Sequence, residues 1–136
     1  ASDVYKRQYK KSGPNVLGVE ALQGDDGCTG VKVNTADGYA DYLFTATDMQ
    51  AHHPSKRVSF CGRLGLIREK EGQIQLMYLG CGRSLKKSNF VLESDHDVYA
   101  AIYMQHGVWY YSATGPVRVK IGKETKELNE GYNQKL

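Results

Sequence analysis

The stretch RVSFCGRLGLIREKEGQIQLMYLGCGRSL (residues 57–85) consists of two apolar segments joined by a charged segment that contains a glycine. Apolar residues alternate with other residues on both sides, which predicts a β-hairpin with its loop at residues 70–72. If Glu69 lies opposite Gln73, Cys61 lies opposite Cys81. A two-residue loop shifts the register by one and places Cys61 opposite Gly80. A disulfide in this hairpin therefore depends on one residue of register.

The cysteine count favours free thiols. Cys28 leaves an odd number of three, which argues against a disulfide framework. No two cysteines have the C-x-x-C spacing of a zinc knuckle. Packed thiols that behave as small hydrophobic residues are the favoured interpretation.

The same period of two recurs outside the hairpin, in residues 41–47, 89–94, 98–104, 108–114 and 116–122. Glycine-, proline- and aspartate-containing turns separate these segments. The pattern predicts an all-β fold, an antiparallel β-sandwich of short strands and hairpins with little or no helix. The predicted core consists of Val31, Val33, Phe44, Phe60, Leu64, Leu66, Ile74, Leu76, Leu92, Ile102, Val117 and Val119.

The chain has 136 residues, 40% of them hydrophobic and 24% charged, which suits one soluble domain. We expect the sandwich to span residues 14–122 and residues 123–136 to form a polar tail. Residues 1–13 are expected to be a non-native or disordered leader, because SDVYKRQ resembles a translated sequencing-adapter peptide found in metagenomic sequence. The chain lacks an initiating methionine, and we expect it to be a fragment.

Several function classes find no support in the sequence. A net charge of +3 is too balanced for a nucleic-acid partner. No apolar run approaches the roughly 20 residues that span a membrane. Nucleophile and phosphate-loop motifs are absent. We therefore expect no nucleic acid, no membrane and no cofactor.

Two polar loops contain potential metal ligands, namely His52 and His53 in one and Asp95, His96 and Asp97 in the other. Adjacent residues on an extended chain point in opposite directions, so they rarely bind one ion together. Solvated turns whose side chains bond to local backbone explain both loops better. We expect no metal site.

An aromatic cluster surrounds the predicted turn at residues 105–107. The residues that can face the core are Val98, Ile102, Val108 and Tyr110. This leaves Tyr99, Tyr103, Trp109 and Tyr111 on the opposite face. Exposed aromatic side chains can stack on sugars or cover another domain, whereas a second sheet of the same domain would make them core residues. We predict that Trp109 is more exposed than its neighbour Val108. The predicted carbohydrate or interdomain contacts are Trp109, Tyr111, Tyr103, Tyr99 and His106.

Three segments carry a family resemblance: ADGYADYLFTATD, the hairpin segment VSFCGRLGLIREKEGQIQLMYLGCGRSL and VYAAIYMQHGVWYYSATGPVRVKIG. Together they resemble the C-terminal β-sandwich region of heparinase II/III-like polysaccharide lyases over residues 14–122. The resemblance implies a secreted or periplasmic lyase of a uronic-acid polysaccharide. In that family a preceding α/α-toroid supplies most of the catalytic residues, and the sandwich packs against it and helps to wall the cleft. The implied partners of this chain are a missing N-terminal catalytic domain and an acidic polysaccharide.

No catalytic residue can be carried over, because the resemblance lies in the scaffold. This chain alone is therefore expected to be non-catalytic. Two alternatives stay open from the sequence. One is a freestanding carbohydrate-binding module that uses Trp109. The other is an oligonucleotide/oligosaccharide-binding barrel, because residues 56–79 resemble the first hairpin of such barrels.

Overall fold

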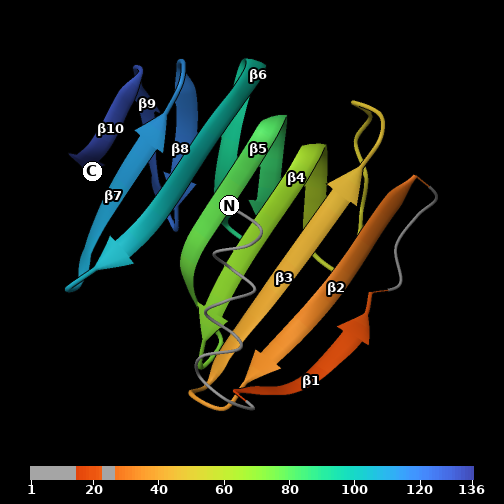
Figure 1. Ribbon diagram of the computed structural model, residues 1–136. Coiled ribbons are helices and arrows are strands. Elements are labelled where there is room, and N and C mark those ends of the chain that lie inside the picture. The colour runs from red at the N-terminus through yellow and green to blue at the C-terminus, as the bar shows by residue number, and fades with distance from the viewer. Residues whose placement is uncertain (1–14, 23–26) are drawn as a thin grey trace.

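The computed structural model describes residues 15–22 and 27–136, and these residues form an all-β fold (Figure 1). The predicted leader, residues 1–13, lies outside the described residues. Within the described part no helix is long and apolar enough to cross a membrane. The strands are β1 (Val16–Ala21), β2 (Cys28–Thr35), β3 (Tyr39–Ala46), β4 (Val58–Lys70), β5 (Gln73–Lys87), β6 (Phe90–Gln105), β7 (Val108–Ala113), β8 (Val117–Ile121), β9 (Glu124–Leu128) and β10 (Gly131–Lys135).

All ten strands join one antiparallel sheet that folds over on itself into two layers. The front layer has the order β1-β2-β3-β4-β5-β6-β7-β10. The back layer contains the first part of β4, the last part of β5 and the first part of β6, followed by β8 and β9. The three long strands β4, β5 and β6 thus run through both layers (Figure 1). The predicted antiparallel sandwich is confirmed.

The bend between the layers depends on two glycines that face each other, Gly62 on β4 and Gly82 on β5. A Cβ atom on Gly82 would lie 2.6 Å from Leu79 Cδ1 and 2.8 Å from Gly62 Cα. Side chains cannot occupy this space, so the two backbones approach closely only because both positions are glycine. The register of the β4–β5 pair shifts at this point, between Cys61 and Gly62. The glycines therefore set where the sheet folds over.

The hairpin that we predicted has a two-residue loop, because Lys70 pairs with Gln73. Glu71 and Gly72 have φ values of 53° and 77°, as a type I′ turn requires. Two register shifts then place Cys61 opposite Ser84, so both registers considered for Cys61 are wrong. Cys61 and Cys81 are free thiols, and Cys61 donates a hydrogen bond to the Met49 carbonyl.

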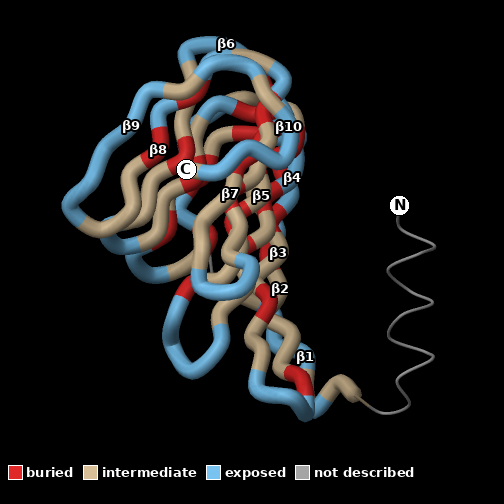
Figure 2. The backbone as a smooth tube through the Cα atoms, turned by 90° about the vertical axis from the view of Figure 1, so that its left-hand side faces the viewer, coloured by how far each residue is buried: buried red, intermediate tan, exposed pale blue. Residues whose placement is uncertain are grey.

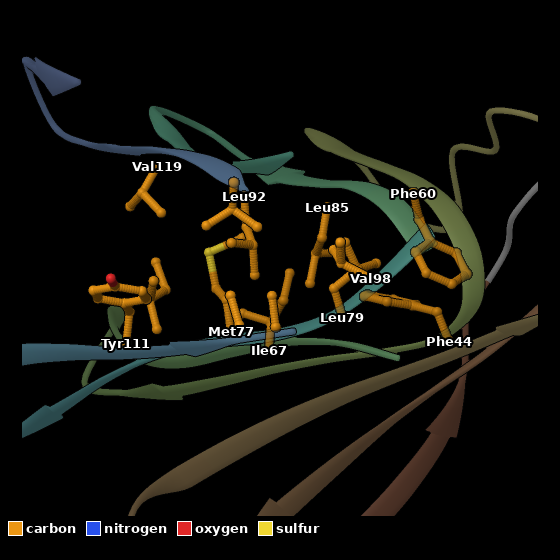
Figure 3. Packing of buried hydrophobic residues seen from close by; sticks show 14 of the residues in the cluster. Phe44, Phe60, Ile67, Met77, Leu79, Leu85, Leu92, Val98, Tyr111 and Val119 are labelled. Atoms are coloured by element: carbon orange, nitrogen blue, oxygen red, sulfur yellow. The ribbon is translucent and has the colours of Figure 1, made fainter. Parts of the chain in front are cut away.

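The core lies between the two layers (Figures 2 and 3). The predicted core residues that are buried are Phe44, Phe60, Ile74, Leu92, Ile102, Val117 and Val119. The core prediction is wrong for five residues that are only partly buried or exposed: Val31, Val33, Leu64, Leu66 and Leu76. The buried apolar positions that we missed include Val58, Ile67, Met77, Leu79 and Leu85.

A register shift explains the errors at Leu76 and Met77. Gln75 is an extra residue on β5 between Ile74 and Leu76, which pair with consecutive residues of β4. Each bulge of this kind exchanges the two faces of the strand that follows. Met77 therefore points into the core where strict alternation from Ile74 would place Leu76.

Residues 124–135 lie in the segment that we expected to be a polar tail, and they form β9 and β10. β9 pairs with β8, and β10 pairs with β7. Most of their side chains are exposed, which agrees with their polar composition. Leu128 and Leu136 nevertheless pack against the core.

Candidate functional site

The structure separates the five predicted contact residues into three groups. Ile102 pairs with Tyr111 and Met104 pairs with Trp109, so these four residues share the inner face of β6 and β7. Tyr103 pairs with Tyr110, and these two share the outer face with Tyr99. His106 belongs to neither group, because it lies in the turn between β6 and β7 with a φ of 52°.

The predicted faces of β7 were therefore reversed. Tyr111 is 8% exposed, and its hydroxyl donates to the Asn129 carbonyl from inside the core (Figure 3). Trp109 is partly buried against Phe90, with ring centroids 5.9 Å apart. The register of β6 with β7 causes this, since the buried residues of β6 are Val98, Ala100 and Ile102. The hypothesis that Tyr111 is an exposed contact is wrong.

The outer side of the front layer carries the surface that we call the tyrosine face, defined by Leu64, Tyr78, Tyr99, Tyr103 and Tyr110. Cross-strand pairing places these residues on one side of β4, β5, β6 and β7, since Leu66 pairs with Tyr78 and Leu76 with Tyr103. Tyr99 is 53% exposed and Leu64 is 38% exposed. This surface is apolar in its rings and polar at its hydroxyl groups.

Packing within the tyrosine face is tight. A Cβ atom on Gly80 would lie 3.0 Å from a ring carbon of Tyr78 and 3.2 Å from Leu64 Cβ. Gly80 thus provides the space over which Leu64 and Tyr78 meet. Tyr103 and Tyr110 stack with centroids 5.9 Å apart and an interplanar angle of 18°. This stacked arrangement stabilises the two rings against each other.

The tyrosine hydroxyl groups are the hydrogen-bonding groups of this face. Burial raises the pKa of Tyr78, and the neighbouring Tyr99 raises it further. The Tyr103 hydroxyl donates a hydrogen bond to the side-chain oxygen of Asn133, whose backbone N–H donates to Ser112 Oγ. The tyrosine face therefore offers rings and hydrogen-bonding hydroxyl groups, and its five members include no Asp, Glu, Lys or Arg.

An ion pair between a half-buried arginine and a buried aspartate lies on the same side of the front layer. Arg68 donates two hydrogen bonds to Asp41, at 2.7 and 2.9 Å, directly across the β3–β4 ladder. Asp41 is completely buried, and the Arg68 guanidinium lies 4.7 Å from the centroid of the Tyr39 ring. This bidentate geometry ties β3 to β4 and explains the burial of a charged residue.

Three of the residues considered as metal ligands, His52, His53 and Asp97, contact other groups of the protein. His52 Nε2 lies 2.6 Å from Asp48 Oδ1, and His53 Nδ1 lies 3.2 Å from the Val58 carbonyl oxygen. Asp97 accepts a hydrogen bond from Arg83 at 2.9 Å. The described residues contain no group of three or more His, Cys, Asp or Glu side chains that could hold a metal ion.

Sequence reasoning missed three members of the tyrosine face, Leu64, Tyr78 and Tyr110. Leu64 was predicted to lie in the core and Tyr110 to face it, and Tyr78 was not among the predicted contact residues. The available signal was the GCG segment at residues 80–82, because glycines within a strand indicate a bulge or a close backbone approach.

Fold and surface together define the class, an all-β domain with one covered face and one aromatic face. Residues 16–104 match the family model of the endo-acting ulvan lyase C-terminal domain. This chain belongs to that family, and the expectation of a polysaccharide lyase C-terminal domain is confirmed. The match spans β1 to β6 and includes four members of the tyrosine face, Leu64, Tyr78, Tyr99 and Tyr103. Neither the curated proteins nor the solved structures contain a match to this chain.

Proposed function

We propose that this chain is the non-catalytic sandwich domain of a secreted or periplasmic polysaccharide lyase and packs on the catalytic domain through its tyrosine face. The family match carries the proposal, because a C-terminal domain of a polysaccharide lyase implies a catalytic partner domain and a polysaccharide. The partner in this proposal is an α/α-toroid of the heparinase II/III-like type, as the sequence resemblance implies. The sandwich then helps to form one wall of the substrate cleft.

We choose the tyrosine face as the contact because the back layer covers only the inner face of the front layer. The inner face of the front layer is already covered by the back layer, with Phe60, Leu85 and Leu92 buried between them. The outer face has no second layer among the described strands. A contiguous aromatic surface of this kind is typical of a protein–protein contact. Tyrosine suits such a seam because its ring is apolar and its hydroxyl can reach a polar partner.

The substrate of the parent enzyme in this proposal is an acidic polysaccharide, and the family description names ulvan. A polysaccharide is too large to enter a cell unaided, which is why we place the enzyme outside the cytoplasm. Elimination next to a carboxylate needs a positioned base and a group that neutralises the acid. We assign both to the catalytic domain.

The absence of catalysis is tested with the chain alone. It is incubated with ulvan, heparan sulfate, chondroitin sulfate and alginate while the absorbance of the unsaturated product is followed. We expect no increase above a boiled control. Product formation by the chain would contradict the assignment of the catalytic groups to the other domain.

The docking surface is tested in the full-length enzyme that carries this domain. Tyr99→Asp places a charge in the proposed seam, and Tyr132→Asp makes the same change at a residue of β10 that is 59% exposed. We expect the Tyr99 variant to lower the thermal stability and activity of the whole enzyme, and the Tyr132 variant to leave both unchanged. Equal behaviour of the two variants would exclude the tyrosine face as the contact.

A further inference from the structure

A pocket opens between the two layers at the end of the sandwich, away from the tyrosine face. Its volume is about 240 Å³, and Trp109, Val108, Val119, Ile121 and Leu136 form its apolar lining. The backbone N–H of Leu136 donates to the Trp109 carbonyl at 2.9 Å, which closes one side. Phe90 packs against the indole and fixes it.

Two side chains of opposite charge stand at the rim. Glu124 pairs with Ile121 and Lys126 pairs with Val119 across the β8–β9 hairpin. Directly paired residues share one face of a sheet, so both charged groups lie on the side of the pocket. Glu124 and Lys126 are exposed, and both line the opening. The pocket thus combines an aromatic wall with one anionic and one cationic group.

This combination fits a sugar that carries a carboxylate. The C–H face of a pyranose ring can cover an indole, and its hydroxyl groups can donate hydrogen bonds to a carboxylate such as that of Glu124. The ammonium group of Lys126 complements the carboxylate of a uronic acid. A neutral sugar would make the ring and hydroxyl contacts but not the ionic contact.

We propose that the Trp109 pocket binds a single uronic acid unit at the end of an acidic oligosaccharide. The size supports a single ring, because pockets for drug-sized ligands have volumes of roughly 300–1,000 Å³. The inference rests on the proposed function for the chemical class of the ligand. It goes beyond that proposal because the pocket lies on the inner side of β7, whereas the docking surface lies on the outer side.

The test uses the chain with D-glucuronate as the probe and D-glucose as the neutral control. Trp109 is the only tryptophan, so its fluorescence reports on this pocket alone. We expect a saturable change with glucuronate and weaker binding of glucose. Lys126→Gln should lower the glucuronate affinity by roughly three- to fivefold and remove the preference over glucose. Lys70→Gln makes the same charge change at the exposed last residue of β4 and should bind as the unmodified chain does.

No saturable change with glucuronate, either in fluorescence or in calorimetry, would overturn the inference. Equal affinities in the Lys126 and Lys70 variants would overturn it as well. Neither result bears on docking, which Tyr99→Asp tests in the full-length enzyme. Conversely, loss of the docking effect with intact glucuronate binding would contradict the proposed seam and leave the pocket in place.

Discussion

The two faces of β6 and β7 differ in what covers them. On the inner face, Ile102 and Tyr111 are buried under the back layer of the same sheet. On the outer face, Tyr103 and Tyr110 stack on each other, and Tyr99 is more than half exposed. The same two strands thus carry one aromatic surface that builds the domain and another that is available to a partner.

The difference shows that an aromatic-rich strand pair does not by itself define a binding surface. Tyr111 contributes its ring to the core and its hydroxyl to a hydrogen bond with the Asn129 carbonyl. Tyr99 makes no comparable contribution to the core. Residue type is the same in both cases, and only the register of the strands decides the role.

The largest effect should come from truncating the inner tyrosine. Tyr111→Ala removes a buried ring and should lower the free energy of unfolding by about 3–5 kcal/mol. Tyr99→Ala on the outer face should cost about 0.5 kcal/mol or less, because surface substitutions have small effects. Urea unfolding of the chain measures both. Similar losses in the two variants would break the distinction between the faces.

An intermediate effect is expected where the sheet folds over. Gly82→Ala places a Cβ atom 2.6 Å from Leu79 Cδ1 and should lower the free energy of unfolding by about 1–3 kcal/mol. Gly18→Ala in β1 is the matched control, since no atom lies within 4 Å of its added Cβ. Thermal unfolding should separate the two variants. If both have the stability of the unmodified chain, the glycine pair does not set the bend that creates the inner face.

The smallest effect concerns a surface ion-pair cluster that joins three strands of the back layer. Glu93 on β6 has its Oε1 atom 2.9 Å from Nη1 of Arg118 on β8. Its Oε2 atom lies 3.5 Å from Nζ of Lys86 on β5. Burial raises the pKa of Glu93, but the hydrogen bonds and charges of Arg118 and Lys86 outweigh it and leave the pKa below the ordinary value of 4.5. Glu93→Gln should therefore lower the stability by about 1 kcal/mol or less at neutral pH.

The sign of the pH dependence follows from the lowered pKa. The folded state favours the charged carboxylate, so its stabilisation is complete above pH 4.5 and is lost as the pH falls through the lower folded value. The difference in unfolding temperature between the chain and the Gln variant should shrink in that acidic range. A difference that stays constant down to strongly acidic pH would exclude the ion pairs as its cause.

The fold was predictable from the sequence because period-two alternation and turn residues recur along the whole chain. The buried residues Phe44, Phe60 and Leu92 followed from that alternation. The face assignment of β5 failed after the bulge at Gln75, since an extra residue exchanges the faces and leaves no clear trace in the pattern. The tyrosine face was therefore only partly predicted, through Tyr99 and Tyr103.

The roles of Trp109 and Tyr111 could not be predicted for a similar reason. Both depend on whether Tyr111 pairs with Ile102, and that register is set by the turn at His106 and Gly107, whose φ values are 52° and 77°. A two-residue loop of this kind was possible from the sequence, but another loop length would have exchanged the faces.

Hydroxyl-radical footprinting tests most directly whether the tyrosine face contacts the catalytic domain. The reactivity of Tyr78, Tyr99, Tyr103 and Tyr110 is compared between the isolated chain and the full-length enzyme, with Tyr132 as the exposed reference. We predict that Tyr99 and Tyr103 lose most of their reactivity in the full-length enzyme while Tyr132 keeps its own. Unchanged reactivity of Tyr99 and Tyr103 would contradict the account.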